Sequence, residues 1–153
     1  MNRTPLLATL LGLAGLLPLF FCGFESLTRA TVWALPALIG YGAVTLAFLG
    51  AVHWGFALAP AAVPTPPQPE RLRLALGTLP ALAAWFALLV PTWAGLLLLI
   101  AAFIATVVVE AAGQRRGLVP PGYMWLRWAH SVILVAILTT VLVLRLIGAT
   151  IVL

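Results

Sequence analysis

The amino-acid sequence predicts an all-α integral membrane protein, a bundle of five transmembrane helices. Of its 153 residues, 64% are hydrophobic and only 7% are charged, and the mean hydropathy is +1.19. A soluble domain of this size could not bury so much apolar surface, whereas a membrane protein exposes it to lipid. The apolar residues also fall into stretches of about 20 residues, which is the length that crosses a bilayer. We expect residues 1–153 to form one domain.

The first apolar stretch covers residues 5–24 and follows Arg3. No Ala-x-Ala-like cleavage site comes after it, so the stretch is typical of an uncleaved first helix rather than a signal peptide. Cys22 follows two phenylalanines, where a lipoprotein signal would have small residues. Pro18 lies inside the stretch and predicts a kink in the helix.

A polar break at residues 25–35 separates the first helix from the second. Glu25 and Arg29 have the i,i+4 spacing of a helical ion pair. The residue before a proline disfavours helical geometry, so we expect a short interfacial helix to end before Pro36. The second transmembrane helix is predicted at residues 37–59.

Small residues recur at every fourth position of the second helix. Such a seam lets two helices approach closely, which is how helices associate in lipid. The sequence does not distinguish packing inside the chain from packing against another subunit. The seam comprises Ala43, Ala47, Ala51, Gly55 and Ala59.

Residues 60–69 contain five prolines and are predicted to form an extended loop. The uncharged run that follows is too long for one span, and Pro91 marks a turn within it. We therefore expect a helical hairpin with helices at 74–90 and 93–112. The fifth helix is predicted at 123–148.

The distribution of arginine predicts the orientation, because short cytoplasmic loops carry an excess of positive charge. With five spans, one side holds six arginines and the other holds two. The rule places the amino terminus in the cytoplasm and the carboxyl terminus outside, in a bacterial inner membrane. No nucleic-acid-binding motif accompanies the basic charge. The larger group is Arg3, Arg71, Arg73, Arg115, Arg116 and Arg127, and the smaller group is Arg29 and Arg145.

Three ionisable residues lie inside or at the edge of the predicted spans, namely His53, Glu110 and His130. The predicted topology brings them to a similar depth near the cytoplasmic side. Ionisable side chains within membranes usually face the bundle interior and find partners. The sequence therefore predicts a polar pocket there, with the candidate ligand-binding residues His53, Trp54, Glu110, Arg127 and His130, and with Trp128 as a further wall.

Several chemistries remain open for this pocket. Two histidines could hold a haem b, join Glu110 on a metal, bind a quinone headgroup or relay protons. Alternatively the residues are structural, with Glu110 paired to Arg115 or Arg116 of the next loop. No metal-binding spacing occurs within one helix, so we predict no metal site from motifs. The sequence has no nucleophile–base motif and no phosphate-binding glycine loop, so no catalytic residues are predicted.

Short apolar motifs with a His-Trp-Gly block resemble a small family of integral membrane proteins. This family includes bacterial proteins of unknown function and the eukaryotic transmembrane protein 69. The resemblance implies a shared fold and a membrane location, and it brings no established activity. It also implies an acidic residue late in the fourth helix, here Glu110, and a hydroxyl residue where this chain has His130. The matching residues are Tyr41–Ala43, Phe48–Gly50, His53–Gly55, Leu79–Pro80, Trp85 and Trp125–Arg127.

The sequence favours a non-enzymatic accessory or assembly partner of a membrane complex. This hypothesis rests on the small size of the chain, the small-residue seam and the absence of catalytic motifs. A membrane protein partner or a second copy of the chain would then cover the seam. The alternative is a binder of haem, quinone or another small ligand at the cytoplasmic-side pocket. A small oligomeric transporter is a third hypothesis, although no inverted repeat is evident.

Overall fold

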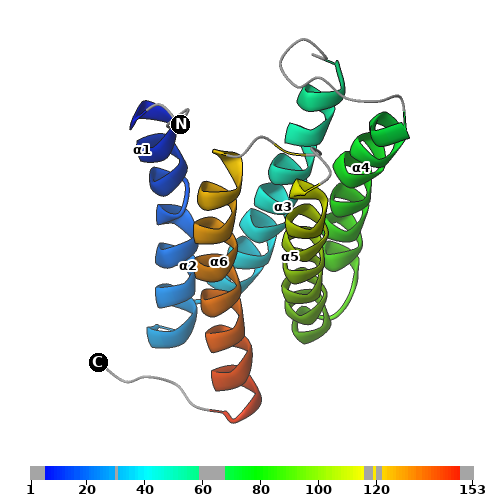
Figure 1. Ribbon diagram of the computed structural model, residues 1–153. Coiled ribbons are helices and arrows are strands. Elements are labelled where there is room, and N and C mark those ends of the chain that lie inside the picture. The colour runs from blue at the N-terminus through cyan, green and yellow to red at the C-terminus, as the bar shows by residue number, and fades with distance from the viewer. Residues whose placement is uncertain (1–5, 30, 59–67, 116–118, 120–121, 149–153) are drawn as a thin grey trace.

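The computed structural model describes residues 6–29, 31–58, 68–115, 119 and 122–148, and these residues form α-helices joined by turns. Five segments are long and apolar enough to cross a membrane, with α1 and α2 together making the first. This confirms the predicted all-α multi-pass architecture. The helices (Figure 1) are α1 (Leu6–Ala14), α2 (Leu17–Thr28), α3 (Ala34–Leu58), α4 (Gln68–Leu89), α5 (Thr92–Gln114) and α6 (Tyr123–Leu146).

The helices run up and down a bundle in which α3 packs against α2, α4 and α5. The start of α1, α4 and α6 and the end of α3 and α5 lie at one end of the bundle, at the top of Figure 1. We call this the amino-terminal end. The opposite end holds the connections from α2 to α3 and from α4 to α5. Segments distant in the sequence, such as the end of α3 and the start of α6, therefore lie at the same end of the bundle.

The first span is broken near its middle rather than merely kinked. α1 ends at Ala14, and α2 begins at Leu17 with Pro18 in its first turn. Proline lacks the N–H that would continue the helical ladder, and its ring clashes with the carbonyl four residues earlier. The break accordingly falls just before Pro18. α2 then continues to Thr28, past the boundary predicted at residue 24.

The predicted interfacial helix between the first two spans is wrong. Glu25 belongs to the last turn of α2, where its carboxylate lies 3.2 Å from the Arg29 guanidinium. The predicted ion pair is therefore confirmed, but as the end of a transmembrane helix. α3 begins at Ala34 and carries Pro36 in its first turn. A proline is tolerated there because first-turn N–H groups have no partner within the helix.

The observed ends of the other helices also differ from the predicted ends. α4 begins at Gln68 rather than residue 74, because Pro69 is compatible with a first turn. Within the predicted loop 60–69, the residues up to 67 lie outside the described part of the chain. α5 starts directly after Pro91, which adopts an extended conformation with ψ 146°. α6 ends at Leu146, two residues before Gly148 turns left-handed with φ +67°.

The predicted seam on α3 does not form one continuous ridge inside the chain. Ala43 is buried and Ala47 is half-buried, whereas Ala51 and Gly55 are exposed. The physical reason is helical drift: a four-residue step overshoots one turn by about 40°, so four steps move the ridge about 160° around the helix. Ala59 lies outside the described residues. The close α3–α4 contact runs instead through Gly50, where an added Cβ would lie 3.1 Å from the Gly77 carbonyl.

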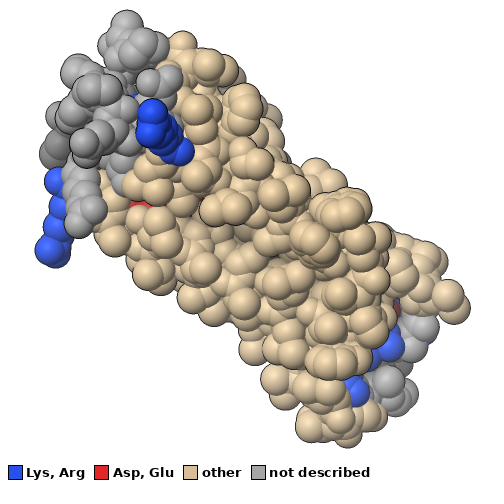
Figure 2. All heavy atoms as spheres, turned by 90° about the vertical axis from the view of Figure 1, so that its right-hand side faces the viewer, with Lys and Arg blue, Asp and Glu red and all other residues tan. Residues whose placement is uncertain are grey.

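The bundle has an apolar core and an apolar exterior, as a protein surrounded by lipid requires. Leu38, Leu46, Leu99, Phe103 and Leu134 are completely buried between the helices. Figure 2 shows the exterior on the α4 side, where uncharged residues fill the middle and arginines gather at both ends. On this face, charge is thus absent from the band that the hydrocarbon would cover.

Candidate functional site

An ionic cluster is buried near the amino-terminal end of the bundle. Glu110 of α5 lies at its centre and contacts one basic side chain from each of two other helices. Glu110 Oε1 lies 2.8 Å from His53 Nε2 of α3, and Glu110 Oε2 accepts a hydrogen bond of 2.5 Å from Arg127 Nε of α6. The side chains of all three residues are completely buried. Both carboxylate oxygens are therefore engaged, and the cluster ties three helices together.

The cluster continues along α6 and leaves some polar atoms without partners. Arg127 Nη1 donates to the Ser131 hydroxyl at 3.2 Å, one turn further along the helix. Arg127 Nη2 and His53 Nδ1 are buried and have no hydrogen-bond partner among the described residues. An unpaired buried polar atom costs about 1–3 kcal/mol. We refer to His53, Glu110, Arg127 and Ser131 as the Glu110 cluster.

The fold explains why these residues meet. Glu110 lies one turn before the end of α5, and Arg127 lies one turn after the start of α6. The two helices are antiparallel neighbours, so both residues reach the same depth. His53 lies near the end of α3, which runs to the same end of the bundle (Figure 1). The Phe56 ring packs edge-on against both His53 and Tyr123, with centroids 5.9 Å and 5.6 Å apart, and closes the cluster with aromatic surface.

His130 is not part of the Glu110 cluster. Its Nδ1 lies 2.8 Å from the Leu126 carbonyl oxygen and its Nε2 lies 2.7 Å from the Gly12 carbonyl oxygen of α1. The second contact joins α1 to α6 and requires close approach, since a Cβ on Gly12 would lie 3.0 Å from the imidazole. The predicted pocket residues are therefore divided between an ionic cluster and a contact that holds the first helix.

A cavity of about 490 Å³ lies between α1, α3 and α6. Its walls from α1 and α3 are mainly apolar, and its polar groups come mostly from α6. Tyr41 of α3 also lines it and donates a hydrogen bond of 2.5 Å to the Gly15 carbonyl oxygen. We call this space the α1/α3/α6 cavity. Its lining residues are Ala8, Leu11, Gly12, Gly15, Tyr41, Val44, Thr45, Phe48, Leu49, Val52, Tyr123, Leu126, Arg127 and His130.

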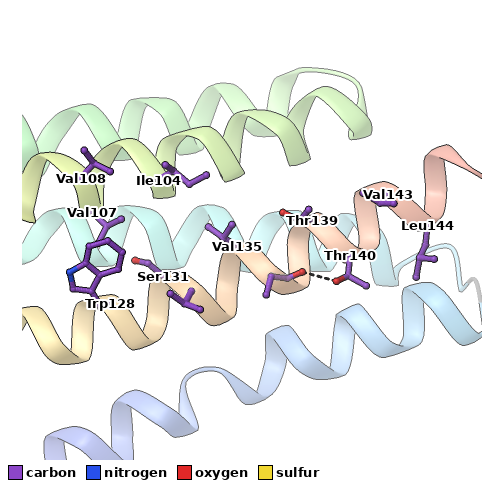
Figure 3. A pocket seen from close by; sticks show the side chains of 12 residues that line it. Ile104, Val107, Val108, Trp128, Ser131, Val135, Thr139, Thr140, Val143 and Leu144 are labelled. Carbon is purple, nitrogen blue, oxygen red and sulfur yellow. Dashed lines mark hydrogen bonds between the residues drawn. The ribbon is translucent and has the colours of Figure 1, made fainter.

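A second concavity follows the outer side of α5 and α6 and has a volume of about 750 Å³. Figure 3 shows its lining, in which valines alternate with the hydroxyl residues Ser131, Thr139 and Thr140. Trp128 lies at one end of this α5/α6 groove and is exposed. Ser131 belongs both to the groove and to the Glu110 cluster.

The structure therefore brings together only some of the sequence-predicted site residues. His53, Glu110 and Arg127 are in direct contact. Trp54 lies on the outside of α3, where its indole covers Gly77 of α4. Glu110 pairs with Arg127 rather than with Arg115, which is exposed at the end of α5, and Arg116 lies outside the described residues.

Two polar residues near the Glu110 cluster, Ser131 and Tyr123, were not predicted from the sequence as members of the site. Ser131 lies one turn after Arg127, and this i,i+4 spacing was a usable signal. Tyr123 reads as an interfacial aromatic residue, yet its hydroxyl is buried and has no hydrogen-bond partner among the described residues. Nothing in the sequence distinguishes a tyrosine that faces lipid headgroups from one that faces an internal cavity.

The arrangement does not favour ligation of a haem iron by the two histidines. The Nε2 atom of His53 already faces Glu110, and the Nε2 atom of His130 already faces a backbone carbonyl. Both contacts would have to break before either nitrogen could bind iron. Within the described residues, no group of three or more His, Cys, Asp or Glu side chains is placed to hold a metal ion.

Comparison with known proteins identifies relatives of this chain but does not assign it an activity. Residues 4–143 match the model of a family described as protein of unknown function (DUF3429). The chain is also similar to transmembrane protein 69 of Xenopus tropicalis, with 41% identity over 93 residues that cover 58% of this chain and 35% of that protein. The match thus spans about a third of the length of that relative. No solved structure matches the chain. The family match covers most of the sequence, so the chain belongs to the DUF3429 family.

Proposed function

We propose that this multi-pass membrane protein binds a small amphipathic molecule in the α1/α3/α6 cavity and does not act as an enzyme. One observation carries the proposal: the cavity joins apolar walls to polar lining residues, namely Tyr41 and Thr45 of α3 and Tyr123, Arg127 and His130 of α6. A cavity of about 490 Å³ falls within the range of small-molecule sites, roughly 300–1,000 Å³.

The lining favours a ligand that has a polar head and an apolar body, because small-molecule sites combine apolar walls with a few polar groups that fix the orientation. The apolar body would lie against Val44, Phe48 and Leu11, away from the polar end. The carboxylate of Glu110 holds Arg127 in place through the 2.5 Å hydrogen bond from Arg127 Nε. A quinone headgroup and an anionic lipid headgroup both have this general form.

The α5/α6 groove supports a second function, that of an accessory subunit packed against a transmembrane helix of another protein. Its lining alternates small or β-branched side chains with hydroxyls such as Thr139 and Thr140. In lipid, helices associate through close packing of such residues and through hydrogen bonds between helices. The occupant that fits this chemistry is a helix with small and hydroxyl residues on one face.

Native mass spectrometry of the protein from gently solubilised membranes tests the binding function. The expected result is a retained small molecule that is lost in Val44→Trp, because the larger ring fills the cavity. Val132→Trp is the matched control, since Val132 lines the α5/α6 groove instead. The two valines are similarly exposed, at 65% and 58%.

Two results would redirect the interpretation. Retention of the same molecule by both variants would show that it binds elsewhere and would refute the cavity as its site. A stoichiometric protein partner that is released by Val132→Trp and kept by Val44→Trp would establish the accessory function instead.

We further propose that the amino-terminal end of the bundle faces the cytoplasm of a bacterial cell. The arginine bias supports this orientation. We expect a membrane-impermeant maleimide to label Ile147→Cys in intact spheroplasts and to leave Gln114→Cys unlabelled until the membrane is opened. Both positions are exposed and both substitutions are made in Cys22→Ser. The reverse labelling pattern would place the amino-terminal end outside.

A further inference from the structure

We infer that α1 is a hinged flap over the α1/α3/α6 cavity, which swings about the break at Gly15 and Leu16 while α2 stays fixed in the bundle. This inference rests on the proposed binding function and adds the part of the protein that would close over the ligand. Three features carry it: the interrupted backbone hydrogen bonds at the break, the unequal packing of α1 and α2, and the origin of the cavity wall.

The backbone hydrogen bonds of the first span are interrupted at the break. The N–H of Leu16 donates to the Leu13 carbonyl oxygen at 3.0 Å, three residues back rather than four. Pro18 has no N–H to offer to the carbonyl four residues before it. Helices bend sharply where their ladder of hydrogen bonds is broken in this way. Gly15 lacks a Cβ and adds backbone freedom at the same point.

The two halves of the first span are packed very differently. None of the nine residues of α1 is buried by the described part of the chain, and α1 lies at the edge of the bundle in contact mainly with α6 (Figure 1). α2 packs against both α3 and α6 and buries Leu19, Cys22 and Gly23. Arg145 of α6 also donates a hydrogen bond of 3.0 Å to the Ser26 carbonyl oxygen of α2. α2 is thus anchored, whereas α1 can move without taking one of its own side chains out of the core.

The cavity wall that comes from the first span belongs entirely to α1 and the break. Ala8, Leu11, Gly12 and Gly15 line the cavity, and α2 contributes none of its described lining residues. On the facing wall, Phe48 of α3 is 68% exposed, so the cavity is open toward the lipid between α1 and α3. A tilt of α1 at the break would therefore change the width of this opening and leave the rest of the bundle in place.

Two side chains that line the cavity also hold the flap. His130 Nε2 lies 2.7 Å from the carbonyl oxygen of Gly12, which is on the moving side of the break. The neutral Nε2–H tautomer and the imidazolium can both make this contact. The Tyr41 hydroxyl donates at 2.5 Å to the carbonyl oxygen of Gly15, which is at the pivot. A tilt of α1 must separate His130 from Gly12 but can keep the Tyr41 contact, so the His130 contact is the latch.

Double electron–electron resonance between nitroxide labels in phosphatidylcholine vesicles measures the motion without an added ligand. Leu79→Cys of α4 carries one label, and either Leu7→Cys of α1 or Phe21→Cys of α2 carries the other, in Cys22→Ser. All three labelled side chains are more than half exposed. Because each helical residue adds about 1.5 Å, Leu7 lies about 12 Å from Gly15, and a tilt of about 20° at the break would move it by about 4 Å.

We expect a broader distance distribution for the Leu7–Leu79 pair than for the Phe21–Leu79 pair. His130→Leu removes the latch, so the first distribution should widen further while the second should not change. Tyr41→Phe is the matched control. Its hydroxyl contacts the pivot, so the Leu7–Leu79 distribution should stay as it is in the parent chain.

Val44→Trp tests whether the motion of α1 is coupled to the cavity. The indole would occupy the cavity beside α1 as a bound molecule would, so the Leu7–Leu79 distribution should narrow. Val132→Trp places the same ring in the α5/α6 groove and should leave the distribution unchanged. Circular dichroism and size-exclusion chromatography confirm folding of each variant.

Four outcomes would contradict the inference. Equally narrow distributions for the two label pairs in the parent chain would overturn the hinge, whatever the variants do. An unchanged distribution in His130→Leu would refute the latch, and equal widening in Tyr41→Phe would place the pivot away from the break. No narrowing in Val44→Trp would show that α1 does not close on the cavity. The native mass spectra of Val44→Trp and Val132→Trp decide the proposed binding function separately.

Discussion

Glu110→Leu is expected to lower the free energy of unfolding by about 3–5 kcal/mol, which is the usual cost of breaking a buried ion pair from one side. The substitution leaves the Arg127 guanidinium buried without a counter-charge and removes the contact that joins α5 to His53. Reversible unfolding in mixed micelles, followed by circular dichroism, measures the change.

Two variants control for the loss of the side chain itself. In Glu110→Leu/Arg127→Leu both charges are gone, so stability should recover in part, since a buried pair can often be replaced by apolar residues. Glu25→Leu breaks a second Glu–Arg pair, whose Arg29 side chain is 71% exposed, and should cost about 1 kcal/mol or less. If Glu110→Leu costs no more than Glu25→Leu, water reaches the Glu110 cluster and the cluster does not hold the helices together.

Gly95→Ala is expected to destabilise the α4–α5 hairpin by about 1–3 kcal/mol through overpacking. A Cβ at position 95 would lie 2.5 Å from the carbonyl oxygen of Ala87. Because that atom belongs to the backbone of α4, no side-chain rotation can relieve the clash and the two helices must separate. The loss is measured as a lower thermal midpoint in detergent.

Other glycines of the same protein provide the comparison. A Cβ added at Gly40 or Gly55 of α3 would have no atom of the described residues within 4 Å apart from its chain neighbours and the nearby backbone of its own helix. Alanine favours a helix over glycine by roughly 0.5–1 kcal/mol, so Gly40→Ala and Gly55→Ala should be neutral or slightly stabilising. A midpoint for Gly95→Ala equal to these two would mean that α4 and α5 are not in close contact at their turn.

The architecture could be predicted from the sequence because lipid imposes a strict rule on the chain. Every backbone polar group must be satisfied within its own segment, so apolar stretches of about 20 residues become helices. That rule is local and can be applied to one segment at a time. Applied to this sequence, the rule predicts the five spans, including the hairpin that turns at Pro91, and the structure has five such spans.

The helix ends could be predicted less well, for a reason that the prolines make clear. The sequence predicts a kink at Pro18, the end of a short helix before Pro36 and an extended loop that includes Pro69. Each of them lies instead in the first turn of a helix. A proline is compatible with either place, and only the course of the backbone on its amino-terminal side decides between them.

The membership of the candidate site was only partly predictable. The sequence by itself determined that His53, Glu110 and Arg127 would lie at one end of the bundle, because the order and length of the spans fix their depth. Depth does not fix direction around the helix axis. The tertiary structure decided that Glu110 faces Arg127 of the next helix rather than the exposed Arg115 of its own, and that His130 faces the Gly12 carbonyl.

The same distinction explains the seam and the cavity. The four-residue spacing on α3 is a fact of the sequence, but the ridge winds away from its neighbour, and Ala51 and Gly55 end up exposed. The α1/α3/α6 cavity exists only because helices from opposite ends of the chain pack around it. The sequence thus determined which segments cross the membrane, since lipid acts on each alone, while the packing between helices decided which side chains meet and where space is left for a ligand.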